Sequence, residues 1–75
     1  MTENPILRLI AGDLDRIEKA DDYNAMREAW KQATSAAAQT AVGYYAHEGA
    51  IPCDLLRAAL DAIRATELGW HKARS

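Results

Sequence analysis

The stretch from Tyr23 to His47, YNAMREAWKQATSAAAQTAVGYYAH, decides the fold. It contains no proline and carries one unbroken heptad pattern, which predicts a single long helix. Its stripe interleaves two series, Tyr23, Trp30, Ala37, Tyr44 and Met26, Ala33, Thr40, His47. Large rings stand at both ends of the stripe and small residues fill its middle. This pattern predicts a narrow middle where another backbone can come close.

The small size of the chain favours assembly through this stripe. With 75 residues it forms one domain (1–75), and such a domain buries only about 60% of the surface of its unfolded chain. Proteins of this length often add disulfides, a metal or a second subunit. Because Cys53 is the only cysteine, no disulfide can form within one chain. We therefore expect a homodimer in which two central helices cross between Ala33 and Ala41.

The N-terminal part of the sequence predicts a first helix over about 5–20. Asn4 is placed to act as its N-cap, and Pro5 suits the first helical position, where a missing N–H costs nothing. The apolar face of this helix holds Ile6, Leu7, Ile10, Leu14 and Ile17. Asp21 and Asp22 are N-cap candidates for the central helix, which covers about 22–47.

The C-terminal part predicts a third helix over about 52–69. Gly49 and Pro52 mark the break before it. Its apolar stripe holds Leu55, Leu56, Ala59, Leu60 and Ile63. Gly69 is expected to end the helix, and residues 70–75 are expected to fray. No strand candidate remains, so the sequence predicts an all-α three-helix bundle with a long central helix.

Composition and charge favour a cytoplasmic protein. The formal net charge is −2, with −3 over residues 1–22 (six acids, three bases) and +1 over residues 51–75 (four bases, three acids). Oppositely charged ends favour docking between helices of the same protein.

The N-terminus lacks the basic and apolar pattern of an export signal, and no apolar run is long enough to span a bilayer. A single cysteine fits a reducing compartment, so we expect a cytoplasmic location and no membrane partner.

Nucleic-acid binding is the alternative. The central helix, the turn over 49–52 and the third helix have the outline of a helix-turn-helix. Its candidate contacts are Arg57, Arg64, His71, Lys72 and Arg74. Asp54 and Asp61 interrupt this edge, however, and the chain is acidic overall, which opposes attraction to phosphates.

Candidates for catalytic or metal chemistry are few. His47, Cys53 and Asp54 lack the paired spacings typical of zinc sites. As a nucleophile, Cys53 has no third residue to orient a base. Glu67 and His71 stand at i and i+4, the spacing of an ordinary surface pair. We therefore expect no enzyme, no metal and no cofactor.

The sequence thus favours a small protein-binding module, acting as an adaptor, inhibitor or regulator through helical packing. The predicted interface consists of Tyr23, Met26, Trp30, Ala33, Ala37, Thr40, Ala41 and Tyr44. Aromatic residues beside basic ones, as around Trp30, are enriched at protein interfaces. Neither the identity of the protein partner nor the process can be read from the residues. The same stripe would also suit packing inside a monomer.

Overall fold

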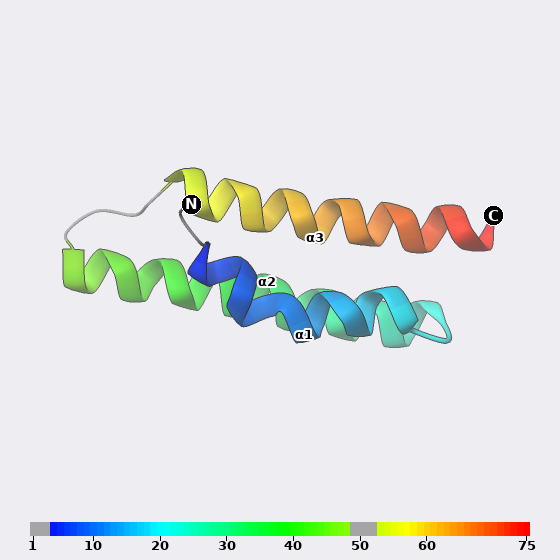
Figure 1. Cartoon of the computed structure of the whole chain (residues 1–75). Coiled ribbons are helices and arrows are strands. Elements are labelled where there is room, and N and C mark those ends of the chain that lie inside the picture. Colours follow the sequence, from blue (N-terminus) through cyan, green and yellow to red (C-terminus); the bar gives the residue numbers. More distant parts are fainter. Residues whose placement is uncertain (1–3, 49–52) are drawn as a thin grey trace.

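A computed structural model describes residues 4–48 and 53–75 of the chain. Three helices make up the fold: α1 (Pro5–Lys19), α2 (Tyr23–Glu48) and α3 (Cys53–Arg74). Successive helices run in opposite directions, so α1 and α3 point the same way (Figure 1). The described part contains no strand, which confirms the predicted all-α fold of three helices.

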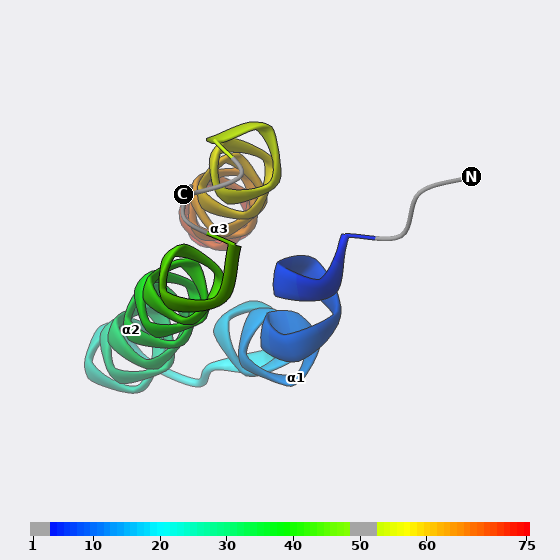
Figure 2. The same cartoon turned by 90° about the vertical axis from the view of Figure 1, so that its left-hand side faces the viewer.

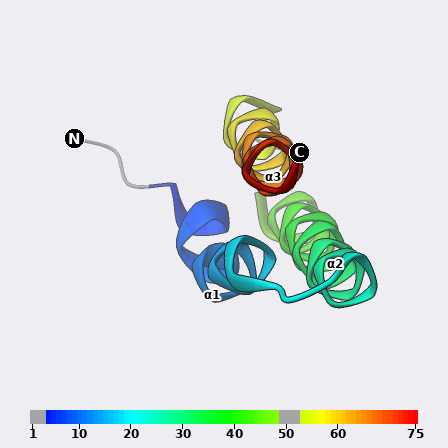
Figure 3. The ribbon, with the colours of Figure 1, turned by 90° about the vertical axis from the view of Figure 1, so that its right-hand side faces the viewer.

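The three helices lie at the corners of a triangle when the bundle is viewed end-on (Figures 2 and 3). The bundle is elongated, with extents of 43 × 23 × 15 Å. At 26 residues α2 is the longest helix, yet α1 packs more extensively against α2 and α3 than those two pack against each other. The shortest helix, rather than the predicted long central one, therefore holds the bundle together.

Asn4 starts α1 and also ties it to α3. Its Oδ1 accepts hydrogen bonds from the backbone N–H groups of Ile6 (3.0 Å) and Leu7 (3.3 Å), which confirms the predicted N-cap. Its Nδ2 donates to the carbonyl oxygen of Leu55, in the first turn of α3, at 3.0 Å. One side chain thus satisfies the orphan donors of α1 and sets the position of α3.

Asp22 caps α2, as predicted. Its Oδ1 accepts from the backbone N–H of Ala25 at 2.8 Å, and its carbonyl oxygen accepts from Met26 at 3.0 Å. From there α2 is continuous through Thr34 and Gly43, the two places where the sequence allowed a bend. The predicted break around Gly49 and Pro52 lies outside the described residues.

The end of α1 is closed by the last turns of α3. The last carbonyls of a helix have no partner within it, and Ala20, the C-cap of α1, is buried. Trp70 Nε1 donates to the Ala20 carbonyl oxygen at 3.0 Å, and Arg74 Nη2 donates to the same oxygen. The Arg74 guanidinium also lies 4.2 Å from the centre of the Trp70 ring. Its positive charge suits the C-terminal end of α1.

The expected end of α3 at Gly69 and the expected frayed tail over 70–75 are therefore wrong. The helix passes through Gly69 and ends at Arg74. A glycine inside a helix costs about 1 kcal/mol relative to alanine. Burying a large apolar side chain contributes about 1.5–3 kcal/mol, and Trp70 is only 7% exposed. The docking of Trp70 therefore outweighs the weakness at Gly69.

We predict that Trp70→Ala destabilises the fold by about 3–5 kcal/mol, because the substitution removes both the buried ring and one donor to Ala20. A domain of this size has a total stability of about 4–11 kcal/mol, so the loss is a large fraction of it. Urea unfolding followed by far-UV circular dichroism measures the change. Leu68→Ala, at an exposed position two residues earlier, is the control. Equal small losses in both variants would contradict the docking of Trp70.

We predict that Gly69→Ala stabilises the protein by about 0.5–1 kcal/mol and raises its Tm by about 2–8 °C. The backbone there is helical, and an added Cβ would meet nothing within 4 Å. Had Gly69 ended the helix in a left-handed conformation, the same substitution would lower the Tm. Thermal unfolding therefore separates the two possibilities by the sign of the shift.

Candidate functional site

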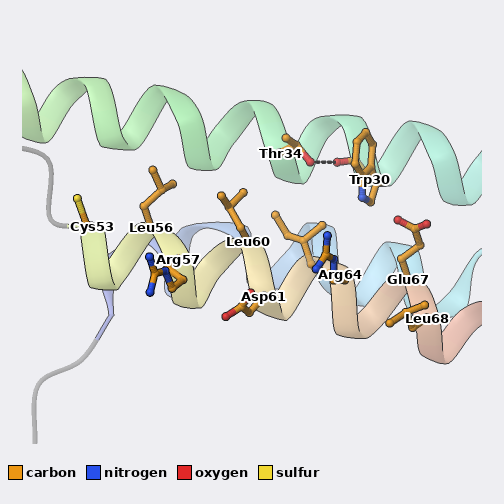
Figure 4. A pocket seen from close by; sticks show the side chains of 11 residues that line it. Trp30, Thr34, Cys53, Leu56, Arg57, Leu60, Asp61, Arg64, Glu67 and Leu68 are labelled. Carbon is orange, nitrogen blue, oxygen red and sulfur yellow. Dashed lines mark hydrogen bonds between the residues drawn. The ribbon is translucent and has the colours of Figure 1, made fainter.

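An open groove of about 950 Å³ runs between α2 and α3 (Figure 4). Trp30 and Thr34 line it from α2, and no described residue of α1 takes part. The lining residues from α3 are Cys53, Leu56, Arg57, Leu60, Asp61, Ile63, Arg64, Glu67 and Leu68. In Figure 4 the Trp30 ring extends from α2 towards α3, while Leu56 and Leu60 extend from α3 towards α2. The groove is thus a surface shared by the two longest helices.

Large apolar side chains line this groove, although half of the buried hydrophobic residues are only alanines. Of the twelve buried hydrophobic residues in the described part, six are alanines. In the groove, by contrast, Leu60 is 43% and Leu68 60% exposed, and Trp30 is only partly buried. Full burial of one leucine contributes about 1.5–3 kcal/mol, so a partner covering this surface would be stabilised by it. Exposed large apolar side chains that line one groove are a feature of interaction sites.

Charges of alternating sign accompany the apolar residues along α3. Arg57, Asp61 and Arg64 are exposed, and Glu67 follows them along the helix. Glu67 Oε2 lies 3.6 Å from Nε2 of His71, one turn further on. The groove therefore offers both signs of charge rather than a field of one sign.

The middle of the predicted dimer interface lies inside the single chain. Ala33 and Ala37 are 0% exposed and Ala41 3%, in a core whose largest fully buried side chains are the isoleucines of α1. The backbone that approaches the narrow middle of α2 is thus that of α1 in the same chain (Figure 2). While α1 is packed there, these alanines offer no surface to a second subunit. A heptad stripe does not distinguish a partner within the chain from one outside it.

The rest of the predicted interface does not form one surface. Met26 is buried, and Tyr44 packs against the core. Tyr23 is half-exposed and lies 6.4 Å, ring to ring, from Trp70, at the end of the bundle seen in Figure 3. Thr40 is partly buried and donates to the carbonyl of Ala36 at 2.8 Å. Only Trp30, of the eight predicted interface residues, lines the groove.

The predicted nucleic-acid contacts are likewise divided. Arg57 and Arg64 line the groove, where Asp61 and Glu67 accompany them. Arg74 is held at Ala20 and Trp70, and His71 lies beside Glu67. Lys72 is exposed on the last turn. These cations form no continuous basic face of the kind that phosphate binding requires.

Within residues 4–48 and 53–75, no three His, Cys, Asp or Glu side chains are placed to hold a metal ion. Cys53 is exposed at one end of the groove. The side chain of His47 is not among those that the structure describes. In the same described ranges, no helix combines the length and the apolar character that crossing a membrane requires.

Comparison of the chain with protein-family models, with curated proteins and with solved structures finds no match.

Two groove residues, Leu60 and Leu68, were missed by the sequence reasoning. Leu60 was assigned to the core stripe of the third helix, and Leu68 was placed at its expected end. Their spacing of eight residues turns them about 80° apart around the helix, and both lie off the buried line through Ala59, Ile63 and Trp70. A third helix extended through Trp70 would have revealed this second, outward face.

We predict that Ala37→Leu destabilises the monomer by about 1–3 kcal/mol, because no space exists around a fully buried methyl group in a close helix contact. Ala38→Leu, at the next position and exposed, changes stability by no more than about 0.5 kcal/mol. The urea midpoint of each variant at low protein concentration measures the difference. If both variants unfolded like the wild type, α1 would not be packed on this stripe.

Proposed function

We propose that this chain is a non-enzymatic protein–protein interaction module that binds a helical segment in the groove between α2 and α3. The observation that carries the proposal is the exposure of Leu60 and Leu68 in one groove with Trp30, in a protein in which half of the buried hydrophobic residues are alanines.

The dimensions and composition of the groove support a helical ligand. From Cys53 to Leu68 its α3 wall is about 22 Å long, which corresponds to about four turns of helix. Amphipathic helices bind in such grooves through apolar anchors spaced one and two turns apart. Trp and Arg, represented by Trp30, Arg57 and Arg64, are enriched among the residues that dominate interface energies.

In this proposal the module serves as a small adaptor, inhibitor or regulator in the cytoplasm. The single cysteine of the chain, Cys53, is exposed and without a disulfide, which fits a reducing compartment. Homodimer formation remains part of the proposal, but through a surface other than the buried alanines of α2.

The nucleic-acid alternative has less support from the side chains. Acidic residues accompany Arg57 and Arg64, and Arg74 is engaged within the fold. A mobility shift at low salt that is lost on Arg57→Ala and Arg64→Ala would favour it over a protein partner.

We predict that Leu68→Glu abolishes partner binding without unfolding the chain, because it places a charge in the apolar part of an exposed surface. Val42→Glu is the matched control, since Val42 is 64% exposed on α2 and lies outside the groove lining. The measurement compares proteins captured from the producing cells by the wild type and both variants, with circular dichroism to verify folding.

A protein binds in the groove if the wild type and the Val42→Glu variant both capture it and the Leu68→Glu variant does not. If every captured protein bound all three forms equally, the groove would not be the docking surface.

A further inference from the structure

We propose that the occupant of the groove is a second copy of this chain, with the two α3 helices packed antiparallel across a two-fold axis near residue 62. This inference rests on the proposed docking role of the groove and specifies its partner.

The charge order along α3 carries the inference. Arg57, Asp61, Arg64 and Glu67 follow one another as plus, minus, plus, minus, and all four line the groove. When such a row is reversed it becomes minus, plus, minus, plus. An antiparallel copy therefore sets Arg57 opposite the partner's Glu67, and Asp61 opposite the partner's Arg64. Two-fold symmetry repeats both pairs, giving four favourable contacts.

The apolar residues fit the same register. Residues come level across the axis when their numbers sum to about 124, so Leu56 lies level with the partner's Leu68. Leu60 lies close to the axis, and its own symmetry copy is displaced by only about 6 Å along the helix. The exposed Leu60 is thereby brought close to its own copy, with charged residues before and after it along the helix. Each α3 would also contact Trp30 on the partner's α2 wall.

A parallel arrangement does not have these properties. In a parallel pair each charge faces its own copy, so that Arg57 meets the partner's Arg57 and Asp61 the partner's Asp61. Such like-charge contacts are unfavourable. The alternating charges along α3 therefore favour the antiparallel orientation over the parallel one.

The size of the groove sets the expected strength. Standard interfaces use about 20–30 residues on each side, whereas eleven line this groove. The dimer is therefore expected to form reversibly, with a Kd of about 1 μM or weaker.

A charge-swap experiment tests the pairing. In sedimentation equilibrium, Arg57→Glu alone and Glu67→Arg alone each reduce self-association by about tenfold or more, because each substitution creates two like-charge contacts per dimer. An equimolar mixture of the two variants associates again, since every reversed contact then joins opposite charges. Lys19→Glu, an exposed site on α1 with the same change in charge, associates like the wild type.

Rescue by mixing supports the proposal, because a contact within one chain cannot be restored by a second chain. Two variants that each associate like the wild type, or a mixture that stays monomeric, would overturn it.

Orientation has an independent readout. Cys53 is exposed and is the only cysteine, so a single spin label can be attached there without other changes. The antiparallel register places the two labelled positions about 27 Å apart along the helix axis. A double electron–electron resonance distance in this range supports the register, and a separation near 10 Å would indicate the parallel pair and overturn it.

Failure of this inference is distinguishable from failure of the proposed function. A wild type that remains monomeric up to about millimolar concentration, yet captures a partner that Leu68→Glu loses, would replace the second copy with another protein and leave the module intact. Self-association unaffected by Leu68→Glu would place the self-association interface away from the groove and overturn this inference alone, while capture of every partner equally by the wild type and Leu68→Glu would overturn the proposed function.

Discussion

Three hydrogen bonds, made by Asn4, Trp70 and Arg74, tie α3 to α1 and set the arrangement of the bundle. Asn4 binds the carbonyl of Leu55 at one end of α1, and Trp70 binds the carbonyl of Ala20 at the other. The span from Asn4 to Ala20 is about 24 Å and that from Leu55 to Trp70 about 22 Å, so the helices match in length. Because both ends are fixed, α3 follows α1 closely. Its contact with α2 is less extensive, and a groove remains between them.

This arrangement leaves several large hydrophobic residues outside the core. The alanines of α2, including Ala33 and Ala37, receive α1 at close range and complete the core. Leu60 and Leu68 of α3 are left exposed in the groove, together with the partly buried Trp30. A chain of 75 residues has little stability to spare, so large apolar groups left at its surface favour association. The alternating charges beside these leucines favour one orientation of the bound partner.

Local chemistry made much of the fold predictable. The N-cap roles of Asn4 and Asp22 followed from short polar side chains before an apolar periodic run. The end of α3 was not predictable from Gly69 alone, because its helix is held by the distant carbonyl of Ala20, 50 residues away from Trp70. The site was missed for a related reason. A close-packing stripe indicates contact but not whether α1 or another chain supplies it, and this choice decides which side chains stay exposed.

The most direct test of this account is hydrogen exchange at the two indole N–H groups, measured by nuclear magnetic resonance in the wild type. The indole N–H of Trp70 is buried and bonded to Ala20, so it should exchange only when the bundle opens, at a rate set by global unfolding. That of Trp30, in the open groove, should exchange several orders of magnitude faster at low protein concentration. Equally fast exchange at both rings would contradict the closure of the bundle by α3 and the groove that results from it.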